Sequence, residues 1–210
     1  MKKRSAMMFL AMIMIPAGPG IAQAAPDNTR ITNVQGTAVL LRGGQTIPAA
    51  VGTECQTNDI LRTNADGVVD VSINNQAGAR ILASSESSII STDPENMQLK
   101  INSGDLLLNI EKLPKGSTFK VETPTAVATV RGTQFSGHVD IHQPDNPTST
   151  FAVREDAVDV SVIGSGETFT LGEGQALDIP HEAIGHLTPR QAFGTEMANL
   201  EQTSTVHTCS

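Results

Sequence analysis

The sequence contains no tryptophan and no tyrosine, and aromatic residues make up only 3% of the chain. Binding sites for sugars and for flat ring ligands usually rely on aromatic platforms, so this composition disfavours both. The sequence also lacks a G-x-S-x-G motif, a P-loop and a dinucleotide-binding glycine pattern. We therefore predict that the protein is not an enzyme and has no catalytic, cofactor-binding or metal-binding residues. Its core must be built from aliphatic side chains.

Apolar runs long enough to span a membrane are also missing. The longest apolar run, residues 6–15, falls short of the about 20 residues that a membrane-crossing helix needs. It follows the positively charged residues 2–4 and precedes the small-x-small sequence Ala-Gln-Ala at residues 22–24. This order is typical of a cleaved export signal. We predict a signal peptide over residues 1–24, no membrane insertion, and a periplasmic or secreted mature protein that begins at Ala25.

Positive charge is scarce. The chain has 14 Lys and Arg against 22 Asp and Glu, and the predicted signal peptide holds three of the cations and none of the acids, which leaves a net charge of −11. Nucleic acids and anionic membrane surfaces are bound through clustered cations. We therefore expect no nucleic acid and no membrane surface among the partners.

The chain has two cysteines, Cys55 and Cys209, both in the part that would be exported. An oxidising compartment permits a disulfide between them, and this bridge would tie the C-terminal tail to the start of the folded domain. Two unpaired thiols are the alternative, because the sequence does not give the distance between the two residues. Their separation along the chain excludes a C-x-x-C redox pair.

Between residues 31 and 179 the chain consists of short strand-like segments separated by turns rich in glycine, asparagine and aspartate. Val69, Val71 and Ile73 alternate with polar residues, which is the period of a strand with one buried face. We expect about a dozen strands at spacings of about ten residues, in a β-sandwich or a β-solenoid of stacked short strand pairs. This all-β domain should extend over residues 25–180.

Two local arrangements follow from the same pattern. Residues 97–101 and 106–110 alternate as two strands, separated by a glycine turn at residues 103–105. Residues 151–154 are expected to pair with residues 158–162 in a hairpin.

The pattern changes after residue 180. Thr188 as the cap, Pro189 at the first helical position and Gln191 at the capping-box position predict a short helix. Its apolar face would contain Ala192, Phe193, Met197 and Leu200. We expect a C-terminal tail, residues 181–210, whose helix packs on its own domain. A helix that binds a partner is the alternative.

The densest group of candidate ligands is His138, Asp140 and His142, which alternate with Val139 and Ile141. On a strand the three polar side chains would share one face, within reach of a common metal ion. An ordinary strand also presents polar residues opposite its core face. A metal or small-ligand site on this face is therefore an alternative function and not a predicted site.

Residues 120–140 combine strand residues, a proline and a lone arginine more densely than any other stretch. The small and β-branched residues 126–130 predict a strand packed closely on both faces. A guanidinium next to such a run would need carbonyl or carboxylate partners. We expect Arg131 to be a buried structural residue and Gly132 to allow two backbone segments to approach closely.

The same stretch resembles the FecR-type periplasmic domain. That family carries T-P-x-A-V-A followed by V-R-G-T-x-F, and residues 123–135 read T-P-T-A-V-A-T-V-R-G-T-Q-F. Residues 59–67 resemble the family's D-x-L-x-T strand and turn. The glycine turns at residues 103–106 and 172–175 fall where the family places its own. The resemblance covers roughly residues 34–179.

This resemblance implies an all-β stack of strand pairs and a role in protein–protein contact outside the inner membrane. In iron-siderophore signalling, proteins with such a domain are inner-membrane regulators of sigma factors. The sequence departs from them, since it has a signal peptide where their cytoplasmic segment lies and no spanning helix. We therefore predict an exported interaction or sensory module of the FecR type that contacts another envelope protein, without sigma-factor control. The alternatives are the ligand-binding face described above and a structural component of the envelope.

Overall fold

The computed structural model describes residues 28–182, 186–203 and 205–206. Within them the all-β prediction is confirmed, with sixteen strands and one short C-terminal helix. The predicted signal peptide and Cys209 lie outside the described residues. The export signal, the disulfide between Cys209 and the buried Cys55, and the domain boundaries at residues 24 and 180 therefore stay predictions. No helix among the described residues is both long and apolar enough to cross a membrane.

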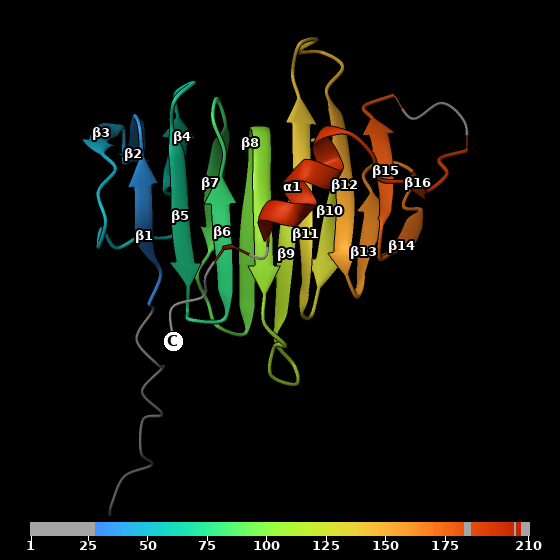
Figure 1. The fold of residues 1–210 in the computed structure, drawn as a ribbon, viewed down its shortest axis with the longest axis horizontal. Coiled ribbons are helices and arrows are strands. Elements are labelled where there is room, and N and C mark those ends of the chain that lie inside the picture. Colours follow the sequence, from blue (N-terminus) through green and yellow to red (C-terminus); the bar gives the residue numbers. More distant parts are fainter. Residues whose placement is uncertain (1–27, 183–185, 204, 207–210) are drawn as a thin grey trace, which may run out of the picture.

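The strands form two sheets that face each other across one apolar core (Figure 1). Sheet A contains, in spatial order, β1 (Arg30–Gln35), β5 (Val68–Ile73), β6 (Ala77–Ile81), β8 (Asn96–Ile110), β11 (Thr133–Asp140), β12 (Thr148–Glu155), β15 (Gln175–Pro180) and β16 (Arg190–Gln191). Sheet B contains β3 (Gln45–Pro48), β2 (Ala38–Arg42), β4 (Ile60–Thr63), β7 (Glu86–Ser91), β8 again, β9 (Thr118–Glu122), β10 (Ala126–Val130), β13 (Ala157–Val162) and β14 (Thr168–Gly172).

Strand β8 belongs to both sheets. Its first part pairs with β7 and, in parallel, with β9, and its second part pairs with β6 and β11. The chain passes from one sheet to the other at Gly104, whose φ of 78° suits glycine. The predicted turn at residues 103–105 is therefore wrong. The glycine bends a continuous strand and does not end it, because both halves find partners on each side.

Consecutive hairpins alternate between the two sheets. The β9–β10 hairpin lies in sheet B, β11–β12 in sheet A and β13–β14 in sheet B. The predicted hairpin between residues 151–154 and 158–162 is consequently wrong. The first segment pairs with β11 and β15, whereas the second pairs with β10 and β14. The turn at Asp156, with a φ of 58°, carries the chain from one layer to the other.

The core between the sheets is aliphatic, with three fully buried phenylalanines, Phe119, Phe135 and Phe151. The ring centroids of Phe135 and Phe151 lie 6.5 Å apart. Strand β10 contributes alternate residues to this core and leaves the others half-buried. The prediction that residues 126–130 pack closely on both faces is therefore wrong, since the outer face of sheet B is partly open.

The C-terminal segment returns across the outer face of sheet A. After β16, helix α1 (Thr195–Thr203) lies over β8, β11 and β12 (Figure 1). The predicted helix start at Thr188 is wrong, because Arg190 and Gln191 pair with β15 and Gly194 has a φ of 57°. The helix packs on its own domain, as expected.

The predicted apolar stripe of this helix is only partly correct. Leu200 is buried, together with Ala152 and Ala176 of the sheet. Phe193 and Met197 are 64% and 42% exposed, so they do not belong to the packed face. The face that meets the sheet instead includes the polar residues Asn199 and Thr203.

Candidate functional site

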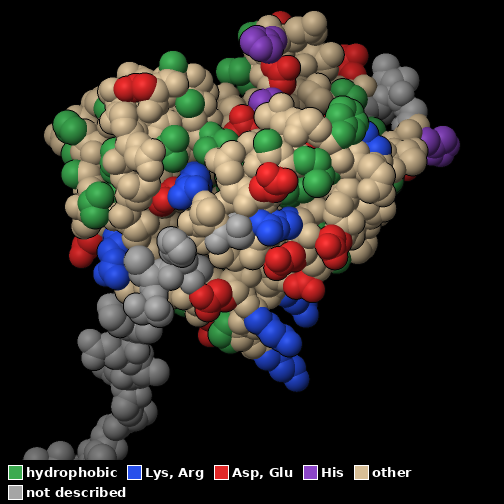
Figure 2. Space-filling view, in the orientation of Figure 1, with side chains coloured by type: hydrophobic (Ala, Val, Ile, Leu, Met, Phe, Trp, Pro, Cys, Tyr) green, Lys and Arg blue, Asp and Glu red, His purple; other side chains and the backbone are tan. Residues whose placement is uncertain are grey.

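A hollow of about 240 Å³ lies between α1 and the outer face of sheet A. Residues with polar side chains from four elements line it, although carbon atoms contribute much of the surface: Asp105 on β8, Ser136 and His138 on β11, Thr150 on β12, and residues of α1. Histidine and acidic side chains lie close together at the upper edge of this face (Figure 2).

Asp105 joins the helix to the sheet at this hollow. Its Oδ1 lies 3.0 Å from Nδ1 of His138 and accepts a hydrogen bond from Nδ2 of Asn199 at 3.2 Å. The hydrogen bond to Asp105 raises the pKa of His138, against the opposing effect of burial, and the carboxylates of Asp140 and Glu196 raise it further. His138 therefore carries its proton to a higher pH than a free histidine does.

Ser136 lies beside this pair and is only 6% exposed. It lines the hollow, and its hydroxyl makes no hydrogen bond with the described residues. The Ser136 hydroxyl oxygen is not itself fully buried, so it is open to solvent through the hollow. This hydroxyl therefore has bonding capacity directed at the hollow.

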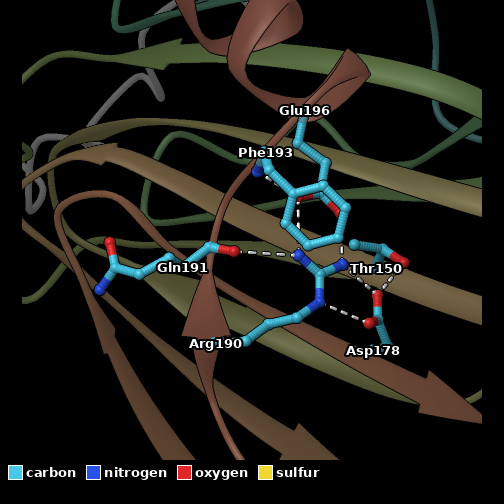
Figure 3. Close-up of polar contacts among 6 residues, drawn as sticks. All are labelled: Thr150, Asp178, Arg190, Gln191, Phe193 and Glu196. Carbon is cyan, nitrogen blue, oxygen red and sulfur yellow. Dashed lines mark hydrogen bonds and ion pairs between the residues drawn. The ribbon is translucent and has the colours of Figure 1, made fainter.

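Arg190 clamps the start of α1 to the sheet (Figure 3). Its Nε donates to Oδ2 of Asp178 at 2.7 Å, and its Nη1 donates to Oε2 of Glu196 at 2.8 Å. The guanidinium carbon also lies 4.6 Å from the ring centroid of Phe193. A planar guanidinium suits such a two-carboxylate arrangement.

The arginine lowers the pKa of both carboxyl groups. For Glu196 the hydrogen bond from Arg190 is the main cause, and the Phe193 N–H adds to it. For Asp178, burial acts to raise the pKa, but hydrogen bonds from Arg190 and Thr150 outweigh it. Both groups are therefore ionised at neutral pH, and their charges hold the arginine in place.

Further polar contacts secure the end of α1. Nη1 of Arg154 donates to the carbonyl oxygens of Leu200 at 3.0 Å and Glu201 at 3.1 Å. A cation suits the last carbonyls of a helix, which have no partner within the helix. The Thr203 hydroxyl donates to Oε1 of Gln134 at 3.1 Å. The helix is thus held by side-chain hydrogen bonds along its length and by one buried leucine.

The three residues of the alternative ligand face, His138, Asp140 and His142, are not brought together. His138 and Asp140 lie on β11, but the strand ends at Asp140 and the His142 side chain is 95% exposed. Nε2 of His142 lies 4.0 Å from Oδ1 of Asp140, whereas His138 pairs with Asp105. Among the described residues, no three His, Cys, Asp or Glu side chains are grouped to hold a metal ion.

The prediction for Arg131 is wrong, because this residue is exposed and forms no ion pair with the described part of the chain. It follows β10 and, with Lys112, borders a surface hollow of about 350 Å³. The prediction for Gly132 is consistent with the structure. A Cβ atom on Gly132 would lie 2.9 Å from Cα of Lys112, and the Leu113 N–H donates to the Arg131 carbonyl at 2.9 Å.

The two edges of sheet A differ in how far they are covered. The backbone N–H of Ile31 on β1 donates to the Thr53 carbonyl at 2.9 Å, and the Gly52 N–H donates to the Ile31 carbonyl at 2.8 Å. A segment of chain therefore covers β1. At the opposite edge, the two-residue strand β16 pairs only with the first two residues of β15, so the outer side of residues 177–180 has no strand partner among the described residues.

One edge of sheet B is blocked by proline. The Ala49 N–H donates to the Ala38 carbonyl at 3.0 Å, so Ala49 faces β2 and Pro48 faces outward. Pro48 has no N–H to offer a further strand. Strand β3 is thus protected against strand addition.

The other edge of sheet B is open. Among the described strands, β14 pairs only with β13. The Val162 N–H donates to the Glu167 carbonyl at 2.8 Å, so the alternation turns the backbone groups of Thr168 and Thr170 away from β13. Gln175 satisfies the N–H of Gly172. Thr168 and Thr170 therefore present free backbone donors and acceptors at the surface.

Comparison with known proteins gives a family and a fold. A family model described as "FecR protein" matches residues 59–162. Two crystal structures, at 1.65 and 2.50 Å resolution, of "a putative anti-sigma factor from Parabacteroides distasonis ATCC 8503" match with a TM-score of 0.54 and 16% identity. The matches cover 66% of this chain and 62% of theirs, so the chain spans less than two thirds of their length. At this identity they show a shared fold. No curated protein matches the sequence.

Proposed function

Because residues 59–162 form a domain of the FecR family, we propose that the chain is an exported, non-enzymatic module that binds another protein of the cell envelope. FecR domains are usually associated with the envelope, and the family is regulatory. The open edge of β14 is the observation that carries the proposal beyond family membership. This edge would accept an extended segment of the partner as an added strand.

The charges around β14 favour a basic partner segment. The exposed carboxylates of Glu167 and Glu173 flank the strand at its two ends, and Asp159 lies on the neighbouring strand opposite Thr170. An added strand with lysine or arginine at its ends would place opposite charges together. The net charge of −11 predicted for the mature chain acts in the same direction over longer distances.

A second copy of this chain fits the edge less well. Antiparallel pairing of β14 with itself about Thr170 would place Glu167 of one copy opposite Glu173 of the other. Like charges directly opposite each other destabilise a strand pair. The proposed occupant is therefore a different protein with a basic extended segment.

Site-specific crosslinking in cells that export the full chain tests this proposal. A photoreactive residue is placed at Thr168, on the open edge, and as a matched control at Thr46, on the blocked edge. The expected result is one defined envelope protein crosslinked through Thr168 and not through Thr46. Thr170→Pro removes an outward-facing N–H and should reduce this product about fivefold, since one backbone hydrogen bond contributes about 1 kcal/mol.

Other outcomes would contradict the proposal. A product that forms equally from Thr168 and Thr46 would point to non-specific contact. Crosslinking between two copies of the chain would identify self-association as the role of this edge. If neither position yields a product, the structural envelope component becomes the better assignment. The metal-binding alternative is not favoured by the positions of His138, Asp140 and His142.

A further inference from the structure

The hollow beneath α1 contains polar atoms that the fold leaves unused. Ser136 and Asn199 are 6% and 7% exposed, so more than nine-tenths of each is buried. The Ser136 hydroxyl and Oδ1 of Asn199 have no hydrogen-bond partner among the described residues, although both residues line the hollow. Neither oxygen is fully enclosed, so both are open to water or to a ligand in the hollow.

Asp105 adds a charge to these two groups. Its Oδ1 receives the hydrogen bonds from His138 and Asn199, while its Oδ2 accepts none from the described residues. Three acceptors therefore line the hollow: Oδ2 of Asp105, Oδ1 of Asn199 and Oγ of Ser136. Three acceptors match the three N–H donors of a primary ammonium group, which has no acceptor of its own.

The surrounding charges favour a cation over an anion. The carboxylate of Glu196, which also lines the hollow, shares the single charge of Arg190 with Asp178. The charge of Asp105 is balanced only when His138 is protonated. An anionic ligand would face Asp105, and protonated His138, which also lines the hollow, is already paired with that carboxylate, so binding an anion costs free energy in a partly buried site.

From these observations we propose that the hollow between α1 and sheet A is a binding site for a primary ammonium group. Ser136, Asn199 and Asp105 supply its hydrogen-bond acceptors. The ammonium belongs either to a free small amine or to the side chain of a lysine. The site is separate from the β14 edge and does not depend on a protein partner.

The size of the hollow limits the ligand. A volume of about 240 Å³ lies below the roughly 300–1,000 Å³ of pockets that hold drug-sized molecules. It accommodates an ammonium group with a short alkyl chain. Larger amines must extend out of the hollow into solvent.

Titration of the purified full chain with n-butylammonium chloride, followed by NMR of the backbone amides, tests the proposal. We expect saturable shifts at residues 105, 136, 138 and 199. Butyrate and n-butanol are matched probes with a negative charge and with no charge, and neither should produce these shifts. Failure of n-butylammonium to bind, or equal binding of all three compounds, would overturn the proposal.

Two variants test the assigned residues. Asp105→Asn keeps the shape of the side chain and should weaken binding at least about tenfold, because it removes the charge-assisted hydrogen bond. Ser136→Ala removes only the unpaired hydroxyl and should weaken binding severalfold. Ser87→Ala is the matched control, since the Ser87 hydroxyl also has no hydrogen-bond partner among the described residues but does not line the hollow. It should leave the affinity unchanged.

Asp105→Asn also changes a side chain that holds α1 through Asn199. If the two variants disagree, Ser136→Ala therefore decides whether the ammonium group binds in the hollow. If n-butylammonium binds Ser136→Ala as tightly as the unmodified chain, the proposed site is wrong. Amide spectra of each variant show whether the remaining fold is intact.

The pH dependence gives an independent test. His138 faces Asp105 on β8, Asp140 on its own strand and Glu196 on α1, with Arg190 beyond Glu196. Its proton neutralises Asp105 and repels a cation, so binding of n-butylammonium should strengthen as the pH rises through the raised pKa of His138. His138→Gln should remove this dependence. A dependence of the opposite sign would contradict the assignment.

Two lysine probes separate the possible sources of the ammonium. Nα-acetyl-lysine methylamide carries the side chain in a peptide-like context, and its Nε-acetylated form is the matched control without the charge. Tighter binding of the lysine probe than of n-butylammonium would assign a protein lysine. Equal or weaker binding would assign a free amine.

Discussion

Ser85 and Gly104 lie directly against each other where β8 passes from sheet B to sheet A. A methyl group on Gly104 would come within 2.2 Å of the Ser85 hydroxyl oxygen and 2.8 Å of the Ser85 Cα. The same hydroxyl accepts a hydrogen bond from the Asp105 N–H at 2.9 Å. The bend in the shared strand therefore depends on a glycine on one side and a small hydroxyl residue on the other.

Gly104→Ala should lower the free energy of unfolding by about 2–4 kcal/mol, through overpacking and a positive φ. Urea unfolding measures the change. Gly166→Ala is the control, because Gly166 has a similar φ of 72° but no atom within 4 Å of the added carbon. It should cost about 1 kcal/mol. Equal losses in the two variants would show that the contact with Ser85 is unimportant.

The neighbouring residues Arg131 and Gly132 should respond in opposite ways. Arg131→Ala should change the free energy of unfolding by no more than about 0.5 kcal/mol, as expected for an exposed side chain without an ion pair. Gly132→Ala should cost about 1–3 kcal/mol, since its Cβ would press on the Lys112 backbone. Thermal melting of the two variants distinguishes them. A larger loss from Arg131→Ala would restore the buried role that the sequence suggested.

Arg190→Ala should loosen α1 while leaving the sandwich folded. Loss of hydrogen bonds to Asp178 and Glu196 should reduce the opening free energy of the helix by about 1–2 kcal/mol. Amide hydrogen exchange of residues 195–203, compared with that of β8, measures this local effect. Arg62→Ala is the control, because it removes the Arg62–Glu86 pair on sheet B. Faster exchange of α1 in that variant would indicate a general loss of stability.

The ion pairs of Arg190 with Asp178 and Glu196 should weaken in acid. The pKa values of Asp178 and Glu196 are lowered in the folded chain. Their contribution is therefore present above the unfolded-state pKa of about 4 and is lost as the pH falls through the folded-state values. Hydrogen exchange of α1 should show the helix loosening at low pH. In Arg190→Ala the exchange of α1 should depend less on pH over this range.

The ionisation of His138 should change the stability of the fold with pH in the opposite direction. Its pKa is raised in the folded chain, so its contribution is complete below the unfolded-state pKa of about 6.5 and is lost as the pH rises through the folded-state value. The melting temperature should fall over this interval in the unmodified chain and stay flatter in His138→Gln. His142→Gln is the control, since that side chain is 95% exposed. An identical pH profile for all three proteins would contradict the role of the Asp105 contact.

The sequence predicts the elements of the sandwich better than their connections. Alternation of Val69, Val71 and Ile73 correctly indicated a strand, but the single buried face that it predicted is wrong, since both faces of β5 are buried. Gly104 and Asp156 looked like ordinary turn residues. One bends a strand that two sheets share, and the other carries the chain between layers. Local sequence does not encode which strands become neighbours.

The candidate site shows the same limit. His138 stood out in the sequence, but beside Asp140 and His142. Its partner is Asp105, which pairs with it across β8 and β11. Nothing in the pattern singled out Ser136 or Asn199, because a serine in a strand and an asparagine in a helix are unremarkable until burial is known. The capping pattern at Thr188 failed because strand pairing with β15 takes residues 190 and 191.

The alternation of hairpins between the layers determines how this chain can be shortened. Ending the chain in the turn at residues 143–146 would remove β12, β15 and β16 from sheet A and β13 and β14 from sheet B. The strands that remain would still face each other in two layers. Shortening the chain from this end therefore takes strands from both layers and not from one layer alone.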